Sequence, residues 1–159
     1  MGTILDSGSR TEYASGAVRD IQEGKGRCDL MPLGVVAIII DSPVIAAIEA
    51  FKFTGYVEHL YDCLKYYTMR ISPHLMLLEV AKHFEEGAKK YGENNWQKGI
   101  PIHSYIDSAI RHYLKHEAGI TDEPHDRAFV WNIMCAIWTK ENKPELDDFT
   151  RKDEEHASN

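Results

Sequence analysis

The amino-acid sequence predicts an all-α domain, a helical bundle of about five or six helices. Apolar residues recur at the helical period in several segments, and the clearest stripe runs through residues 106–114. Serine–proline pairs at Ser42–Pro43 and Ser72–Pro73 are typical of helix starts, because the hydroxyl caps free N–H groups and proline fits the first turn. No strand-like alternation rises above this helical signal. The fold class therefore follows from periodicity and helix boundaries together.

Composition and charge exclude several classes of function. The chain has 159 residues, 43% of them hydrophobic and 27% charged, which is ordinary for one globular domain with a real core. Its net charge of -7 argues against non-specific nucleic-acid binding. The longest apolar run, residues 33–40, is too short to span a membrane. Three cysteines without a CxxC spacing indicate buried thiols in a reducing compartment, so we expect a cytoplasmic protein.

The N-terminal part of the chain shows no helix or strand period. Residues 1–15 are small and polar, and we expect a flexible leader. Residues 16–31 hold three glycines and a dense mixture of charges, among which Lys25 and Arg27 stand out. Such a segment is more often a solvated loop, but it could also be an arm that folds over an anionic ligand.

The middle of the chain is expected to be helical. Residues 33–40 suit a buried helix or a buried strand, and the helical patterns that follow favour a helix. Residues 44–53 and 57–67 repeat at helical spacing on either side of a break at Thr54–Gly55. The next predicted helix starts at Pro73 and ends at Gly92, since glycine is favoured at helix C-termini.

The most apolar predicted helix follows a start signal at Thr121–Pro124. From Ala128 to Trp138 the sequence is apolar nearly all round, with Asn132 as the one polar residue, so we expect this helix to be central. Residues 141–159 are rich in Lys, Asp and Glu and are expected to form a charged C-terminal tail.

Two pairs of carboxylates lie on these predicted helices. Glu79 and Glu86 are seven residues apart and share one side of a helix, while Glu123 and Asp126 are three apart at a helix start. Carboxylates that converge on one pocket suit a hard divalent cation that bridges to phosphate. Each pair alone has a simpler explanation: Glu86 could pair with Lys90, and acidic residues at a helix start complement its dipole.

Basic and aromatic residues lie close to these carboxylates in the sequence. Cationic groups could neutralise phosphates, and aromatic rings could stack on a base. The residues concerned are Lys89, Lys90, Tyr91, Asn95 and Trp96 in one segment, and Arg111 and His112 in another. An ordinary loop with Trp96 in the core is an equally weighted alternative. Neither GxxxxGK[ST] nor GxGxxG occurs, so the P-loop and Rossmann routes to nucleotides are absent.

Three histidines could bind a transition metal: His112, His116 and His125. The HxxxH spacing of the first two resembles a zinc-protease helix, but that signature needs Glu directly after the first histidine, and Tyr113 stands there. A zinc site therefore has weak support, and His112 beside Arg111 is better placed for phosphate.

Three blocks of the sequence resemble a known family. They are SGAVRDIQEGKGRCDLMPL, EEGAKKYGENNWQKG and SAIRHYLKHEAGITDEPHDRAFVWN. They are similar to bacterial and phage proteins of the dATP/dGTP diphosphohydrolase N-terminal domain family, which is grouped with the MazG-like all-α nucleotide pyrophosphohydrolases. The resemblance covers about Ser15 to Trp138, and we take residues 16–140 as a domain of this kind.

The resemblance implies a homo-oligomer, a dimer or tetramer, that cleaves a (deoxy)nucleoside triphosphate, dGTP or dATP above all, to the monophosphate and pyrophosphate. It also implies Mg²⁺ or Mn²⁺ held by helix carboxylates. MazG-like enzymes carry ExxE on one helix and ExxD on another. Glu123 and Asp126 fit ExxD, whereas Lys82 stands where ExxE would place a glutamate after Glu79.

These expectations combine into a mechanistic hypothesis. The predicted metal ligands are Glu79, Glu86, Glu123 and Asp126, and the last three are also the predicted catalytic residues. The predicted substrate-binding residues are Lys25, Arg27, Lys89, Lys90, Tyr91, Asn95, Trp96, Arg111, His112 and Asn132. Replacing Asp126 by Asn is expected to abolish turnover.

Two rival interpretations stay open. An HD-type phosphohydrolase would need a histidine, an adjacent His–Asp pair and a later aspartate, which His112, His125–Asp126 and Asp147 or Asp148 could supply. It would release tripolyphosphate or a single phosphate. A helical accessory protein that binds nucleotide without turnover is the non-enzymatic alternative.

Overall fold

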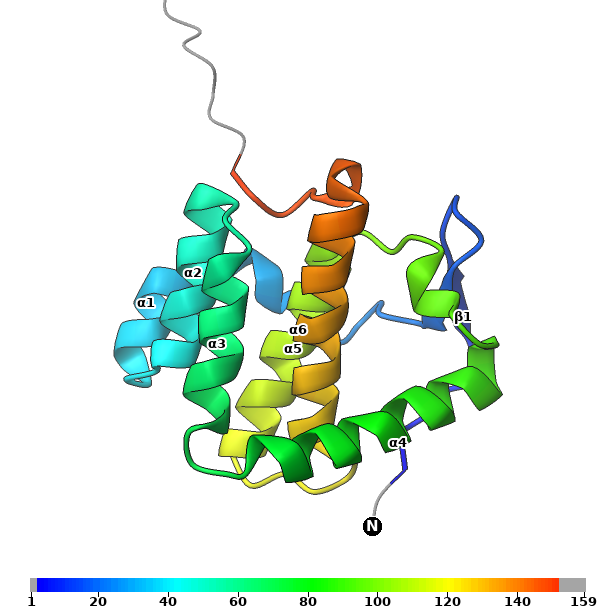
Figure 1. The fold of residues 1–159 in the computed structure, drawn as a ribbon, viewed down its shortest axis with the longest axis horizontal. Coiled ribbons are helices and arrows are strands. Elements are labelled where there is room, and N and C mark those ends of the chain that lie inside the picture. Colours follow the sequence, from blue (N-terminus) through cyan, green and yellow to red (C-terminus); the bar gives the residue numbers. More distant parts are fainter. Residues whose placement is uncertain (1–2, 152–159) are drawn as a thin grey trace, which may run out of the picture.

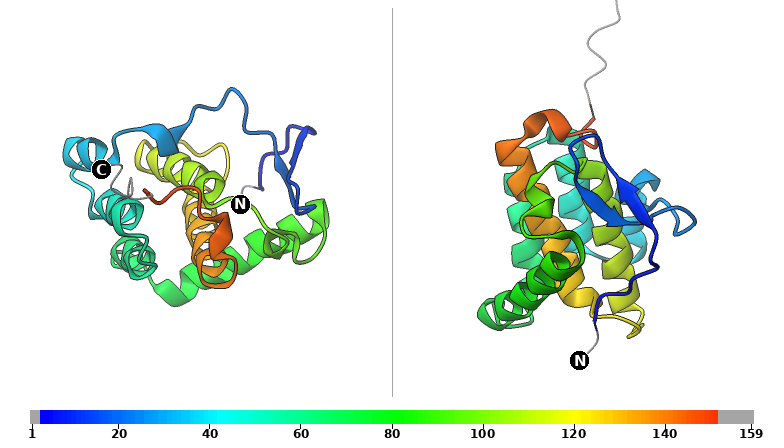
Figure 2. Two further views of the ribbon diagram at one scale, coloured as in Figure 1. Left: turned by 90° about the horizontal axis from the view of Figure 1, so that it is seen from above. Right: turned by 90° about the vertical axis from the view of Figure 1, so that its right-hand side faces the viewer.

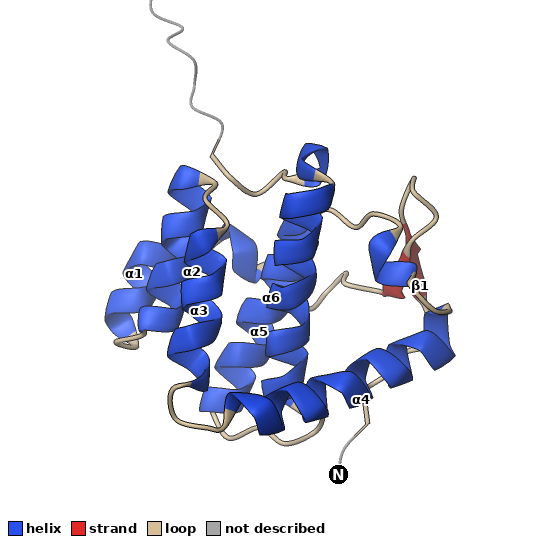
Figure 3. Cartoon of the chain, viewed as in Figure 1, coloured by secondary structure: helices blue, strands red, loops and turns tan. Residues whose placement is uncertain are grey.

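The described residues, 3–151 of a computed structural model, form six α-helices and one small two-stranded sheet, which confirms the predicted all-α class (Figures 1 and 3). The helices are α1 (Leu33–Ile39), α2 (Pro43–Thr54), α3 (Glu58–Thr68), α4 (Pro73–Tyr91), α5 (Ile102–Glu117) and α6 (His125–Asn142). Single 3₁₀ turns span Cys28–Leu30, Asn95–Gln97 and Pro144–Leu146. Residues 1–2 of the predicted leader and 152–159 of the predicted tail lie outside the described residues.

The helix boundaries follow the local signals in the sequence. Ser42 Oγ accepts a hydrogen bond from the Ile45 amide at the start of α2, and Ser72 caps α4 in the same way. Gly55 ends α2 with a φ of 70°, a left-handed conformation that favours glycine. The ambiguous run at residues 33–40 forms α1, as the flanking helices suggested.

The sequence-based prediction of no strand in residues 16–31 was wrong. Arg10–Glu12 (β1) pairs antiparallel with Val18–Asp20 (β2), which makes a hairpin whose turn is closed by a hydrogen bond from the Gly16 amide to the Tyr13 carbonyl. Each strand has three residues, which is too short for a period of two to stand out in the sequence.

The bundle is built around the antiparallel pair α5 and α6 (Figure 1). The pair α2 and α3 covers one side, α4 crosses one end of α6, and the hairpin lies beyond the C-terminal end of α4 (Figures 1 and 2). Fully buried apolar side chains from α2, α3, α5 and α6 fill the centre, including Phe51, Leu60, Ile106, Phe129 and Ile133. This arrangement leaves a space between the hairpin, α4 and the central pair.

Residues 144–151, the described part of the predicted tail beyond α6, lie against the bundle. Phe149 is buried and stacks on Phe51 at 6.0 Å between ring centres. The cysteines Cys63 and Cys135 are buried free thiols, and Cys28 is half-buried. Among the described residues, none of the helices combines the length and the apolar character that a membrane crossing requires.

Candidate active site

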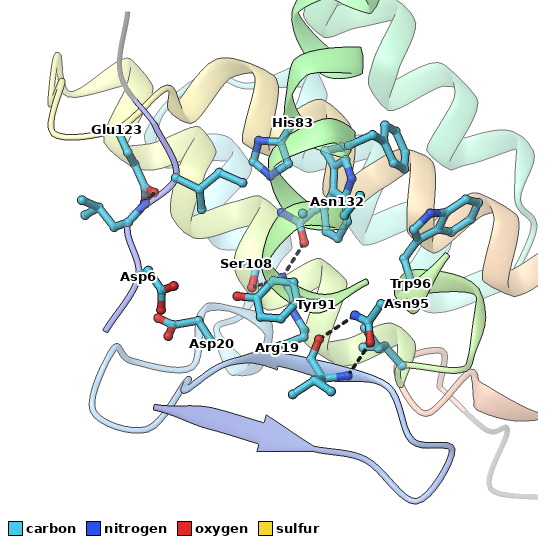
Figure 4. Close-up of a pocket in the computed structure, with 18 of the residues that line it drawn as sticks. Asp6, Arg19, Asp20, His83, Tyr91, Asn95, Trp96, Ser108, Glu123 and Asn132 are labelled. Atoms are coloured by element: carbon cyan, nitrogen blue, oxygen red, sulfur yellow. Dashed lines mark hydrogen bonds between the residues drawn. The ribbon is translucent and has the colours of Figure 1, made fainter. Parts of the chain in front are cut away.

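A cavity of about 850 Å³ lies between the hairpin, α4, α5 and α6 (Figure 4). Its volume is within the range of small-molecule sites in proteins. Phe84, Trp96 and Trp131 form an aromatic wall, and the rest of the lining mixes apolar, polar and charged side chains, among them Arg19, Lys25 and Arg111. An aromatic wall together with charged groups suits a ligand that has both an aromatic and a charged part.

The cavity gathers eight of the predicted site residues from distant parts of the chain. These are Lys25, Tyr91, Asn95, Trp96, Arg111, His112, Glu123 and Asn132. The other predicted site residues do not line it: Arg27, Glu79, Glu86, Lys89, Lys90 and Asp126.

The predicted carboxylates of α4 face an arginine of α6. Glu86 Oε1 accepts a hydrogen bond from Arg127 Nη2 at 2.6 Å, and Glu79 Oε2 lies 4.0 Å from Arg127 Nη1. The two glutamates therefore do share one face of α4, as their spacing predicts, but this face meets a buried guanidinium. The Asp126 carboxylate accepts a hydrogen bond from the Arg127 amide, within the first turn of its own helix.

Residues 4–7, which we call the N-terminal strap, line the cavity beside two of the predicted carboxylates. The Ile4 amide donates to Glu86 Oε2 at 3.0 Å, and the Leu5 amide donates to Glu123 Oε2 at 3.1 Å. Lys90 donates to the Ile4 carbonyl. Because neighbouring residues are about 3.8 Å apart, the strap brings Glu86 and Glu123 within roughly 10 Å of each other. The first described residues of the predicted leader are thus hydrogen-bonded to the site.

The protonation of Glu86 reflects these contacts. Its partial burial opposes ionisation, but the hydrogen bonds from the Ile4 amide and from Arg127 outweigh this effect and hold the pKa of Glu86 below its usual range. Glu86 is therefore a carboxylate at neutral pH.

Glu123 lies beside two histidines that the sequence places thirteen residues apart. His112 Nδ1 and His125 Nδ1 are 2.8 Å apart, and each is 3.7 Å from Glu123 Oε1. A point equidistant from these three atoms lies about 2.0 Å from each, which matches metal–nitrogen and metal–oxygen bond lengths. The three side chains could hold a metal ion. We call them the His–Glu–His cluster.

The neighbours of this cluster suit metal ligation. Burial, with His125 next to it, keeps the pKa of His112 well below its usual range, so its imidazole is neutral. His125 Nε2 lies 2.5 Å from Asp122 Oδ1. A histidine that donates one N–H to a carboxylate and offers its other nitrogen is the usual arrangement of a metal-ligating imidazole. Two nitrogens and one carboxylate oxygen suit Mn²⁺ or another transition ion better than Mg²⁺.

The later aspartates required by the HD-type rival do not join the cluster. Asp147 pairs with Lys140 at 2.7 Å, and Asp148 pairs with His103. His103 precedes His112 on α5 by nine residues, which is about 14 Å along the helix. Among residues 3–151, neither Asp147 nor Asp148 therefore supplies the last ligand that the rival needs.

Two cations of the cavity are committed to protein acceptors. Arg111 donates to Asp107 and to the Gly26 carbonyl, both at 2.6 Å, so it fastens the loop that follows the hairpin. Lys25 pairs with Asp20 at 3.1 Å.

Arg27, outside the cavity, makes two hydrogen bonds of 2.8 Å to Asp29. Lys89 lies 3.8 Å from Glu85 on the surface of α4.

Asn95 is engaged in holding the hairpin in place. Its Oδ1 accepts from the Val18 amide at 2.8 Å and its Nδ2 donates to the Val18 carbonyl at 2.7 Å (Figure 4). Both ends of the side-chain amide are thereby occupied. Trp96, the next residue, packs edge-on against Phe84 and Trp138, so it belongs to both the aromatic wall and the bundle core.

The structure adds two residues to the site that sequence reasoning missed, Arg19 and His83 (Figure 4). Arg19, on β2, reaches Ser108 and Asn132. His83 packs against Trp131 at 5.2 Å, and burial lowers the pKa of His83 to about 3. The sequence did hold a signal for a polar partner at this place. Ser104, Ser108 and His112 are spaced by four residues, so they form one polar face on a helix, and Arg19 contacts the two serines of that face.

Comparison with known proteins identifies one matching family. A family model described as dATP/dGTP diphosphohydrolase, N-terminal, matches residues 61–149, which hold α4, α5, α6 and the His–Glu–His cluster. No curated protein and no solved structure matches the chain.

Proposed function

Because the chain belongs to the dATP/dGTP diphosphohydrolase N-terminal family, we propose that it hydrolyses (deoxy)nucleoside triphosphates, purine ones above all, to the monophosphate and pyrophosphate. The observation that carries this proposal is the His–Glu–His cluster, which brings three possible metal ligands together at a nucleotide-sized cavity. Three cationic side chains that line the same space support an anionic substrate: Arg19, Lys25 and Arg111.

We propose that His112, Glu123 and His125 hold the metal ion, with Mn²⁺ favoured over Mg²⁺ by the two imidazole nitrogens. A divalent ion bound there would polarise phosphate oxygens and supply hydroxide at neutral pH. Asp122 orients His125 through its Nε2, and the Leu5 amide orients Glu123 through Oε2. Glu86, within roughly 10 Å on the other side of the strap, is a candidate ligand for a second ion.

The rest of the cavity would bind and orient the substrate. The aromatic wall of Phe84, Trp96 and Trp131 offers stacking surface for a base. The cationic residues on the hairpin and α5 would balance the charge of the phosphates. Asn95 supports this arrangement as a positioning residue, because it holds Val18 and with it the strand that carries Arg19.

Product analysis tests the proposed reaction. The purified protein is incubated with each NTP and dNTP in Mn²⁺ or Mg²⁺, and the products are separated by anion-exchange chromatography. We expect equimolar monophosphate and pyrophosphate, with the fastest turnover for dGTP or dATP, and no reaction in EDTA. Release of tripolyphosphate or of a single phosphate would favour the HD-type rival. Binding of nucleotide without any turnover would favour the accessory-protein alternative.

We also propose that the protein works as a homo-oligomer. Apolar side chains of α4 and of the turn before it lie on the surface: Met69 is 77% exposed, Leu75 65% and Leu78 64%. A separate groove of about 440 Å³ has an almost wholly apolar lining from α3, α4 and α6, which includes Met76 and Leu77 of α4. Exposed apolar area of this kind marks interaction sites on proteins, and a second copy of the chain would cover it.

A further inference from the structure

We propose that Arg19, on β2 of the hairpin, binds a phosphate group of the substrate; this inference rests on the proposed function. Arg19 is a cation of the cavity that has only neutral acceptors. Its Nη2 donates to Asn132 Oδ1 at 2.9 Å and to Ser108 Oγ at 3.2 Å, and its Nη1 donates to Ser104 Oγ at 3.4 Å. Within residues 3–151, no carboxylate oxygen lies within 4.0 Å of this guanidinium.

A cation in this position needs an anion for its charge to be balanced. The guanidinium lies 5.2 Å from the ring centre of Tyr105 and 5.9 Å from that of Trp131, so aromatic rings replace part of its water. A partly buried charge without a counterion carries some desolvation cost, and a phosphate would supply two acceptor oxygens in the geometry that guanidinium prefers. Arg111, by contrast, already has Asp107 as its counterion.

The neutral partners fix the direction of the Arg19 side chain. Asn132 Nδ2 donates to the Ala128 carbonyl at 2.8 Å, which turns its oxygen towards Arg19. The guanidinium is thus held in place from α5 and from α6 without being neutralised. Because one Nη1 proton and the Nε proton have no acceptor in these contacts, they remain for a ligand.

The position along α5 relates Arg19 to the proposed metal site. Ser108, which Arg19 contacts, precedes His112 by four residues, so the two side chains lie on one face about 6 Å apart along the helix axis. The ring centre of Trp131, in the aromatic wall, lies 5.9 Å from the Arg19 guanidinium. A nucleotide with its base on this wall would bring its phosphates past Arg19 before they reach the His–Glu–His cluster. Arg19 would therefore select phosphorylated ligands and align them.

Binding of inorganic pyrophosphate in EDTA, measured by isothermal titration calorimetry, tests this inference without metal and without turnover. Arg19→Met should weaken binding about tenfold or more, since a charge-assisted hydrogen bond contributes at least this factor. Arg19→Lys should lose less affinity than Arg19→Met, because it keeps the charge but not the planar pair of donors. Arg70→Met, which removes an exposed arginine after α3, is the matched control and should bind as the wild type does.

Three results would overturn the inference. Wild-type affinity in Arg19→Met would show that the phosphate binds elsewhere. Equal losses in Arg19→Met and Arg19→Lys would show that Arg19 only ties the hairpin to α5 and α6. Failure of the wild type to bind pyrophosphate would show that the cavity has no anion site. Each result is independent of the proposed hydrolysis, because a protein without turnover would still bind pyrophosphate through Arg19.

Discussion

At the residue scale, burial decides the charge of His83. The side chain is 7% exposed and packs against Trp131, and its pKa is about 3 in the folded protein against 6.5 for an unburied histidine. Between these values the unfolded chain binds a proton that the folded chain does not. Stability is therefore fully present above pH 6.5 and falls as the pH decreases towards 3.

Removal of His83 should make the free energy of unfolding less dependent on pH below 6.5. From pH 7 to pH 4 the wild type should lose about 3 kcal/mol of unfolding free energy through this group alone. His83→Phe, which keeps an aromatic ring against Trp131, should lose correspondingly less over the same range. Urea unfolding at both pH values measures this. His74→Gln, at an exposed position of α4, is the control, and the prediction fails if His83→Phe has the same pH dependence as that control.

Single residues also mark the limit of what the sequence can predict about the site. Spacing correctly placed Glu79 and Glu86 on one face of α4, but it could not tell that Arg127 of another helix meets this face. Likewise the sequence pointed to Glu123 and to His112, whereas the 2.8 Å contact between His112 and His125 arises only when α5 and α6 pack. Pairings between helices depend on their relative rotation, which periodicity along one helix does not contain.

At the scale of the elements, the N-terminal strap contributes backbone groups to the site. The Leu5 amide donates to Glu123, so it orients a proposed metal ligand without using a side chain. Leu5→Pro removes this N–H and should lower Mn²⁺ affinity about tenfold, as the loss of a supporting hydrogen bond does at other metal sites. Leu5→Ala keeps the amide and should bind Mn²⁺ as the wild type does. Equal Mn²⁺ affinities of the two variants would show that the Leu5 amide does not support the metal site.

The predictability of the elements follows from their length and their boundary signals. The long helices repeat their apolar pattern several times, and α2 and α4 begin at Ser–Pro pairs, so their presence could be predicted. The hairpin could not, because three-residue strands leave no measurable period. The hairpin matters for the proposed function because its strand β2 carries Arg19. The hydrogen bond between Tyr13 and Ser104 holds the hairpin turn against α5.

At the scale of the whole molecule, the exposed apolar face of α4 predicts association. Leu75 and Leu78 are three residues apart and both lie on the surface. Light scattering after gel filtration should give a dimer or tetramer for the wild type, and Leu75→Glu/Leu78→Glu should shift it to the monomer, because buried charge without a partner is costly. Ile39→Glu, in the separate exposed apolar patch of α1, should leave the assembly unchanged. A monomeric wild type would contradict this proposal.

The central claim is that α5 and α6 bring a metal ion to the cavity through the His–Glu–His cluster. The most direct test is a Mn²⁺ titration followed by electron paramagnetic resonance, in which bound Mn²⁺ loses its free six-line signal. We predict that His112→Asn weakens the tight site at least tenfold, and that Asp126→Asn, whose carboxylate lies outside the cavity, retains it. Loss of the site in Asp126→Asn with wild-type binding in His112→Asn would contradict the account.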